Sequence, residues 1–231
     1  MKDLISIPKI VGIIGNSGSG KSNFISRFKN DKKTGIVNND TVKCNLVDEQ
    51  LEYYVKLYKF KLPILEDRKT EIMKMLNIDK SILNQSIYEI SESEYAKVLI
   101  ASILLYNPEV IIVDEYLEAL DFRSKNKVLK LFIKLKKFFK KKIIIITSNI
   151  DDIYEFIDDI IVIDDGKVLL EGKKTILFDN IDLLYKRNIK VPYIVSFIDK
   201  MRLNNIKLDR VDTINELIKT LYREMRWFFE I

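Results

Sequence analysis

One segment near the start of the chain, GNSGSGKS at residues 15–22, constrains the fold more than any other feature of the sequence. A short apolar run, Ile10–Ile14, precedes it, and a stretch with helical character follows from Ser22 to about Asn30. A strand, a glycine-rich turn and a helix in this order form a P-loop unit. The segment fits the pattern G-x-x-x-x-G-K-[ST] without a mismatch, so the sequence predicts a nucleotide-binding α/β domain.

The residue types of this loop indicate how it would hold phosphate. Glycines allow backbone N–H groups to converge on phosphate oxygens, and the start of the following helix adds positive partial charge. We expect Lys21 to reach the β- and γ-phosphates and the Ser22 hydroxyl to coordinate Mg²⁺. The expected nucleotide-binding residues are Gly15, Asn16, Ser17, Gly18, Ser19, Gly20, Lys21, Ser22 and Asn23.

A pair of acids supplies the second half of a nucleotide site. The apolar run Val110–Val113 ends in Asp114 and Glu115. We expect Asp114 to hold Mg²⁺ through water and Glu115 to orient or deprotonate the attacking water, as the catalytic residue. A P-loop alone fits kinases, GTPases and ATPases alike, and this pair narrows the choice toward nucleotide hydrolysis.

The rest of the pattern alternates strands with helices, which is typical of a largely parallel sheet. Residues 35–47 read as a loop, and about 50–106 reads as a helical region. Near-continuous apolar strands are predicted at 109–115 and 142–148, with an amphipathic helix between them at 126–142 and a hairpin at 160–170.

Composition excludes several classes of protein. The chain has no histidine, which rules out histidine-based triads and HExxH metal sites. Cys44 is the single cysteine, so neither an intrachain disulfide nor a zinc cluster can form. No apolar run approaches the roughly 18 residues of a membrane helix, and the start lacks a secretory signal. The net charge of +5 is modest and indicates no nucleic-acid partner.

The residues after Glu115 resemble the ATPase subunits of ABC transporters. Leu120-Asp121 resembles their D-loop, and the turn Asp164-Asp165-Gly166 resembles the one that follows their switch segment. The tail, especially residues 211–217 (VDTINEL), resembles the C-terminal helical extension of energy-coupling factor (ECF) transporter ATPases. The resemblance covers nearly the whole chain.

This resemblance implies a P-loop NTPase (ABC ATPase-like) fold: a mostly parallel sheet, a helical subdomain at about 50–106 and a reduced antiparallel β-subdomain. A nucleotide-binding domain would span 1–171 and a C-terminal helical extension 172–231. The implied ligands are ATP and Mg²⁺. The implied partners are a second ABC ATPase subunit and a transmembrane coupling subunit of a vitamin or metal-ion importer. The chain would be cytoplasmic and held peripherally at the inner face of the membrane.

Five departures from the family pattern bear on the mechanism. The Gly-rich signature segment is replaced by Ile90–Glu94 (ISESE), which still makes a capping box but places two acids where a partner's ATP would lie. Ser148 stands in place of the switch histidine. Asn38 and Asn39 stand where the family has a glutamine.

The remaining departures concern the base of the nucleotide. Residues 1–14 contain no aromatic residue to stack on adenine. Only 13 residues separate Ser22 from Ile36, too few for the family's antiparallel β-subdomain. We therefore expect a slow or partner-dependent ATPase. Two alternatives remain open: a non-catalytic nucleotide-binding partner or regulatory subunit, and a small-molecule kinase.

Overall fold

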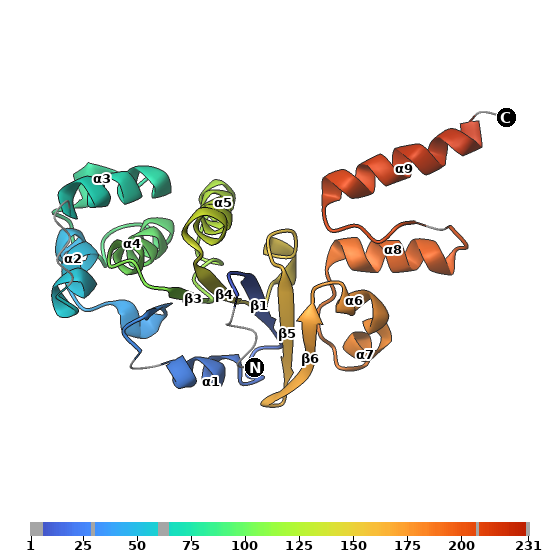
Figure 1. Cartoon of the computed structure of the whole chain (residues 1–231), viewed down its shortest axis with the longest axis horizontal. Coiled ribbons are helices and arrows are strands. Elements are labelled where there is room, and N and C mark those ends of the chain that lie inside the picture. Colours follow the sequence, from blue (N-terminus) through green and yellow to red (C-terminus); the bar gives the residue numbers. More distant parts are fainter. Residues whose placement is uncertain (1–6, 29–30, 60–64, 207, 230–231) are drawn as a thin grey trace.

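The computed structural model describes residues 7–28, 31–59, 65–206 and 208–229 (Figure 1). In this part of the chain, six strands form one sheet in the order β2-β3-β4-β1-β5-β6. Neighbouring strands are parallel except for β5 and β6, which form an antiparallel hairpin. The strands are β1 (Ile10–Ile14), β2 (Thr34–Val37), β3 (Val110–Asp114), β4 (Lys142–Ile146), β5 (Asp159–Asp164) and β6 (Lys167–Lys173).

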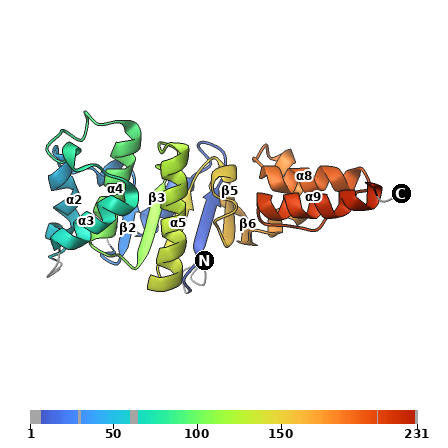
Figure 2. The same cartoon turned by 90° about the horizontal axis from the view of Figure 1, so that it is seen from above.

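Helices cover both faces of the sheet and extend beyond its two edges. They are α1 (Lys21–Ile25), α2 (Val47–Leu57), α3 (Leu65–Leu76), α4 (Glu92–Leu105), α5 (Phe122–Phe139), α6 (Ile176–Asp179), α7 (Ile181–Lys186), α8 (Tyr193–Leu203) and α9 (Ile214–Phe229). Short 3₁₀ turns are η2 (Ser26–Phe28), η3 (Asn39–Thr41), η4 (Lys80–Ile82) and η5 (Ile150–Asp152). Figure 2 shows α2, α3 and α4 beyond the β2 edge and α8 and α9 beyond the β6 edge.

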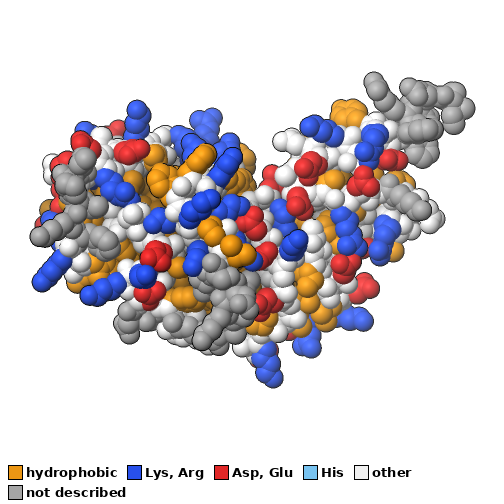
Figure 3. Space-filling view, viewed as in Figure 1, with side chains coloured by type: hydrophobic (Ala, Val, Ile, Leu, Met, Phe, Trp, Pro, Cys, Tyr) orange, Lys and Arg blue, Asp and Glu red, His pale blue; other side chains and the backbone are white. Residues whose placement is uncertain are grey.

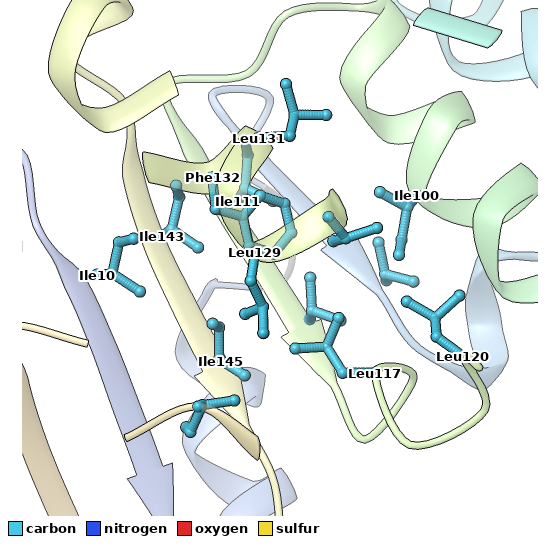
Figure 4. Packing of buried hydrophobic residues seen from close by; sticks show 14 of the residues in the cluster. Ile10, Ile100, Ile111, Leu117, Leu120, Leu129, Leu131, Phe132, Ile143 and Ile145 are labelled. Atoms are coloured by element: carbon cyan, nitrogen blue, oxygen red, sulfur yellow. The ribbon is translucent and has the colours of Figure 1, made fainter. Parts of the chain in front are cut away.

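The central strands are apolar on both faces because both faces are covered. Alternate side chains of a strand point to opposite faces. Ile143 and Ile145 pack in the cluster that contains Phe132 of α5 (Figure 4), whereas Ile144 and Ile146 pack in the cluster on the α1 side. Full burial of each such side chain contributes about 1.5–3 kcal/mol, so this double-sided core is the main stabilising element of the domain.

Two expectations from the sequence were wrong in detail. The segment 35–47, read as a loop, begins with strand β2, whose pairing with β3 stabilises a short apolar run. Helix α5 begins at Phe122 and not at 126, because the Asp121 side chain accepts hydrogen bonds from the backbone N–H groups of Arg123 and Ser124. An N-cap of this kind extends a helix beyond its apolar pattern.

The predicted hairpin and the helical character of the region after residue 50 are confirmed. Within the described residues, no helix is long and apolar enough to cross a membrane. The strands β3, β4 and β1 are neighbours and parallel, so their carboxyl ends meet at one edge. Asp114, Thr147 and the P-loop all lie at that edge.

Candidate nucleotide-binding site

The P-loop connects β1 to α1, and its glycines are required by its path. Gly18 and Gly20 have φ angles of 78° and 93°, in the left-handed region that glycine adopts freely. A Cβ on Gly15 would lie 2.2 Å from the carbonyl oxygen of Ile163. Because this oxygen belongs to the backbone, it cannot rotate away as the end of a flexible side chain could. The loop therefore runs against the end of β5 with no room for a side chain at its first position.

Lys21 is held inside this loop. Its side chain is buried, and its Nζ donates hydrogen bonds to the carbonyl oxygens of Gly15 at 2.8 Å and Asn16 at 2.9 Å. The same Nζ lies 3.7 Å from Oε1 of Glu115. The structure thus brings the loop lysine and the expected catalytic acid together.

The two acids that follow β3 lie in different surroundings. Burial and the neighbouring charge of Glu115 raise the pKa of the Asp114 carboxyl, while a hydrogen bond from Ser22 and the charge of Lys21 lower it; the net shift is upward. Oδ1 of Asp114 is buried and has no hydrogen-bond partner among the described residues. The Glu115 side chain is half exposed, and its backbone is left-handed, with φ 63°. Such strain in a residue that is not glycine is typical of functional sites.

A hollow of about 740 Å³ lies in front of these groups. Its wall contains Ser22 from α1, Asp114 and Glu115 after β3, and Asn38 and Asn39 after β2. Glu92 and Tyr95 from the first turns of α4 complete it, together with Tyr116 and Glu118. The hollow thus joins the P-loop, the acidic pair and the altered signature segment.

The remaining expected loop residues differ in exposure. Asn16, Ser17, Gly18 and Asn23 are exposed, and Ser19 is buried with a hydroxyl that has no hydrogen-bond partner among the described residues. The Asn23 N–H donates to the carbonyl oxygen of Gly20, which closes the first turn of α1.

The switch segment after β4 is fixed by an acid whose role the sequence did not reveal. The carboxylate oxygen Oε1 of Glu118 accepts from the Thr147 hydroxyl at 2.8 Å, the Ser148 N–H at 3.2 Å and the Ser148 hydroxyl at 3.1 Å. Ser148 therefore lies beside the hollow, where the resemblance had placed the switch residue.

The altered signature segment is an ordinary helix start. Ser91 and Glu94 form the expected capping box, and hydrogen bonds from Ser91 hold the pKa of the Glu94 carboxyl below its usual range. Ser93 Oγ lies 2.9 Å from Oδ2 of Asp121, the residue that resembles the D-loop aspartate. The first turn of α4 and the start of α5 are thus linked.

The two asparagines after β2 do different things. The Asn38 side chain accepts from the N–H of Asp40 and begins the η3 turn. Oδ1 of Asn39 accepts from the Tyr116 hydroxyl at 2.9 Å, and the Tyr116 ring stacks on that of Tyr95 at 6.2 Å between centroids. A hydrogen bond and a ring stack therefore connect this loop to the acidic pair and to α4.

Two contacts from the C-terminal half reach the P-loop, and the sequence predicted neither. The Gly166 N–H at the tip of the β5–β6 hairpin donates to the Ser19 carbonyl oxygen at 2.8 Å. Nδ2 of Asn16 donates to the Arg187 carbonyl oxygen at 3.4 Å, and the Arg187 guanidinium lies 3.4 Å from Asp164.

The same C-terminal segment also contacts the switch segment. Nζ of Lys190 donates to Oδ1 of Asn149 at 2.7 Å and lies 2.8 Å from Asp151. The Tyr193 N–H, at the start of α8, donates to Oδ1 of Asp151 at 2.8 Å. Residues 187–193, the connecting segment, therefore bridge the P-loop and the residues just after Ser148.

Comparison with known proteins agrees with this geometry. Residues 5–118 match the family model described as ABC transporter. The energy-coupling factor transporter ATP-binding protein EcfA2 of Mycoplasmoides gallisepticum is 28% identical over 235 residues, covering 85% of this chain and 74% of that protein. An EcfA2 of Staphylococcus epidermidis is 27% identical over 254 residues, covering 96% of this chain and 88% of that protein.

Solved structures show the same fold. The dimeric structure of MJ0796, a bacterial ABC transporter cassette, is 25% identical with a TM-score of 0.65, covering 73% of this chain and 87% of that one. CbiO1 from Clostridium perfringens, part of the ABC transporter complex cbiONQ, is 23% identical with a TM-score of 0.61. It covers 84% of this chain and 88% of that one.

The sheet, with the P-loop and the Asp-Glu pair at its edge, has the fold of ABC transporter cassettes, which confirms the fold predicted from the sequence. More particularly, residues 5–118 match the ABC transporter model, and the chain is similar to ECF transporter ATP-binding proteins over most of its length, as its motifs indicated.

Proposed function

We propose that this chain binds and hydrolyses ATP as an energy-supplying subunit of an ECF-type importer for a vitamin or a metal ion. The observation that carries the proposal is the hollow lined by Ser22, Asp114 and Glu115, with Lys21 of the P-loop 3.7 Å from the Glu115 carboxylate. Over most of its length the chain is similar to proteins named ECF transporter ATP-binding protein.

In this proposal the residues at the P-loop hold the nucleotide. Backbone N–H groups of the loop bind phosphate oxygens, and Lys21 Nζ exchanges its loop carbonyls for the β- and γ-phosphates. Glu115 orients or deprotonates the attacking water. The Ser22 hydroxyl and the unpartnered Oδ1 of Asp114 are hard oxygen donors that fit Mg²⁺, with Asp114 acting through water. When bound, Mg²⁺ neutralises charge on the phosphates.

The decisive experiment replaces Glu115 by Gln. The amide is nearly isosteric but cannot take a proton, so we expect ATP binding within about twofold and hydrolysis reduced by at least about 100-fold. A matched control is Glu89→Gln, an exposed acid outside the hollow, which should change neither. Phosphate release that is unchanged in Glu115→Gln would show that this chain is not the catalyst.

Turnover by the isolated chain is proposed to be slow, because two groups of the family mechanism are changed. Ser148 cannot become cationic, and Glu92 lies in the wall of the hollow with a negative charge. Loss of one stabilising donor reduces a rate by about 10²–10³. We propose that the active form is a pair of ATPase subunits, since a related cassette is known as a dimer. The chain would then be peripheral on the cytoplasmic face of the membrane.

A second hollow, of about 300 Å³, fits the membrane partner. It lies between the loop after β2 and helix α2, and its wall includes Thr41, Tyr53, Leu57 and Tyr58. Phe60, the next aromatic residue along the chain, lies outside the described residues. We propose that a helix of the transmembrane subunit binds here, because Asn38 and Asp40 line both this hollow and the one at the nucleotide site.

This docking surface can be tested separately from catalysis. Leu57 is 51% exposed, so Leu57→Glu should leave the fold and ATP binding intact but prevent recovery of the chain with a polytopic membrane protein. Leu203→Glu, at a leucine of α8 that is 72% exposed, is the matched control. Equal recovery of both variants with the membrane protein would remove this surface from the proposal.

The alternative function is a nucleotide-binding subunit without catalysis. The altered segment at Ile90–Glu94 and Ser148 favour it, whereas the intact P-loop and Asp-Glu pair favour hydrolysis. Glu115→Gln separates the two, because only a catalyst loses phosphate release.

A further inference from the structure

A third hollow lies at the opposite edge of the sheet from the P-loop, between α3, α4 and α5. Its volume is about 230 Å³, and its wall is mostly apolar, with Ile72, Leu104, Ile111 and Leu131 inside. Apolar pockets with a few converging polar groups are the usual form of small-molecule sites.

Large apolar side chains remain exposed around its mouth. Met75 is 45% exposed, Phe138 is 66% exposed and Phe139 is 65% exposed. Figure 3 shows orange side chains gathered over α3 and α5 with blue side chains around them. An apolar patch rimmed by charge marks a binding surface more often than a free one.

Among the described residues, two cations in the wall have hydrogen bonds to carbonyl oxygens alone. The Arg68 guanidinium donates to the carbonyl oxygens of Leu104 and Leu105, each at 3.0 Å. Nζ of Lys141, a buried residue, donates to the carbonyl oxygens of Asn107 and Pro108. Since a guanidinium has five N–H groups and an ammonium three, each cation keeps at least one donor for another acceptor.

These charges are poorly balanced. Burial lowers the pKa of both side chains, and the charge of Arg68 further lowers that of Lys141. Two acids oppose this lowering: Glu71, in the wall, raises the pKa of Arg68, and Glu109 raises that of Lys141. The Glu109 carboxylate, however, is already paired with Lys33 at 3.0 Å. Lys134, exposed at the rim, adds a third positive charge. An anion inside the hollow would relieve this repulsion.

We propose that this hollow binds a small amphiphile with one anionic headgroup, a carboxylate or a phosphate, on a short alkyl chain. A cavity of about 150 Å³ takes up benzene, so this one has room for roughly eight to ten carbon atoms. Arg68 also caps the carbonyl end of α4, and Lys141 bonds the turn after it, but neither role requires an apolar hollow or exposed phenylalanines beside it. The ligand site is independent of ATP hydrolysis.

The test uses decanoate, below its micelle concentration, with the full chain labelled at its methionine methyl groups. Met75 lies in the wall of the hollow, whereas Met201 lies on α8 and serves as the internal control. We expect decanoate to shift the Met75 methyl resonance in a saturable way and to leave that of Met201 unchanged. Decanol, with the same chain and no charge, should bind about tenfold more weakly.

Paired charge reversals test the cationic rim. Lys134→Glu should weaken decanoate binding about tenfold, the effect of one charged contact. Lys127→Glu, on the same helix and outside the hollow, makes the same change of net charge and should alter binding by less than about twofold.

Several results would overturn the proposal. They are no shift of Met75 at millimolar decanoate, equal affinity for decanol, or equal effects of the two lysine variants. Vesicles of phosphatidylglycerol form a separate arm. A Met75 response to vesicles without any response to decanoate would make this surface a membrane contact and not a small-ligand site.

Discussion

The Glu118 carboxylate accepts hydrogen bonds from both the N–H and the hydroxyl of Ser148, at 3.2 and 3.1 Å. These hydrogen bonds hold Ser148, the residue at the switch position, beside the hollow at the candidate nucleotide site. Its side chain is a neutral hydroxyl, and the group that binds it is a carboxylate. A carboxylate in that place would also orient an imidazole and favour its charged form.

This relationship predicts that Ser148→His increases the rate of ATP hydrolysis. An imidazole beside Glu118 can become cationic and stabilise the transition state, so we expect an increase of about tenfold or more. The measurement is single-turnover phosphate release at saturating ATP. Ser148→Asn is the control, because an amide donates a hydrogen bond but cannot carry charge. Equal rates for the two variants would contradict the argument.

Asp114→Asn should stabilise the fold while abolishing Mg²⁺-dependent nucleotide binding. The raised pKa of Asp114 means that folding disfavours the ionised form of this carboxyl. The wild-type chain is therefore more stable at a pH below the ordinary pKa of the carboxyl. It loses that stability as the pH rises through the raised pKa. Asparagine does not titrate. We therefore expect a higher midpoint of thermal unfolding for the variant at pH 7, with a gain that shrinks as pH falls toward 4. A gain independent of pH would show that desolvation of this carboxylate is not its source.

Gly15→Ala should damage nucleotide binding more than Gly18→Ala. A Cβ at Gly15 meets backbone at 2.2 Å and forces the loop away from β5, whereas a Cβ at Gly18 meets nothing within 4 Å. At Gly18 the expected penalty is the left-handed strain alone, roughly 1 kcal/mol. We expect at least about tenfold weaker ATP binding for Gly15→Ala and less than about fivefold for Gly18→Ala. Equilibrium titration with a fluorescent nucleotide would measure both, and the reverse order would be incompatible with this loop path.

Gly35→Ala should lower the free energy of unfolding without changing the residues of the candidate nucleotide site. Its Cβ would lie 2.3 Å from Cγ2 of Ile103, where β2 packs against α4. Overpacking of this kind costs about 1–3 kcal/mol. Gly172→Ala, whose Cβ would make an ordinary 3.5 Å contact with Ile176, is the control. Urea unfolding measures both, and equal stability of the two variants would mean that β2 and α4 separate freely.

Much of the fold could be predicted because its signals are local. The P-loop pattern, the apolar run before Asp114 and the turn at Asp164-Asp165-Gly166 each lie within a few consecutive residues. Strand β2 was missed because its two apolar side chains, Ile36 and Val37, carry almost no periodicity, and only pairing with β3 defines the segment as a strand.

The site was less accessible to sequence reasoning, because its supporting contacts join distant parts of the chain. The hydrogen bond between Glu118 and Ser148 joins two segments that are distant in the sequence, so the motif around Glu118 does not predict it. The contact of Gly166 with Ser19 depends on the hairpin tip folding back over the P-loop. The residues around Glu118 give no indication of which loop its carboxylate will contact.

The connecting segment at 187–193 links the two loops of the candidate site to the C-terminal helices. One of its ends is hydrogen-bonded to Asn16 and the other to Asn149 and Asp151. It therefore connects the two loops that border the candidate nucleotide site. A change in the distance between those loops would bend or displace the connecting segment, and α8 begins directly at its end. Helix α8 is thus tied to both loops through its first residue and the segment before it, so a change in the distance between the loops would displace the helix.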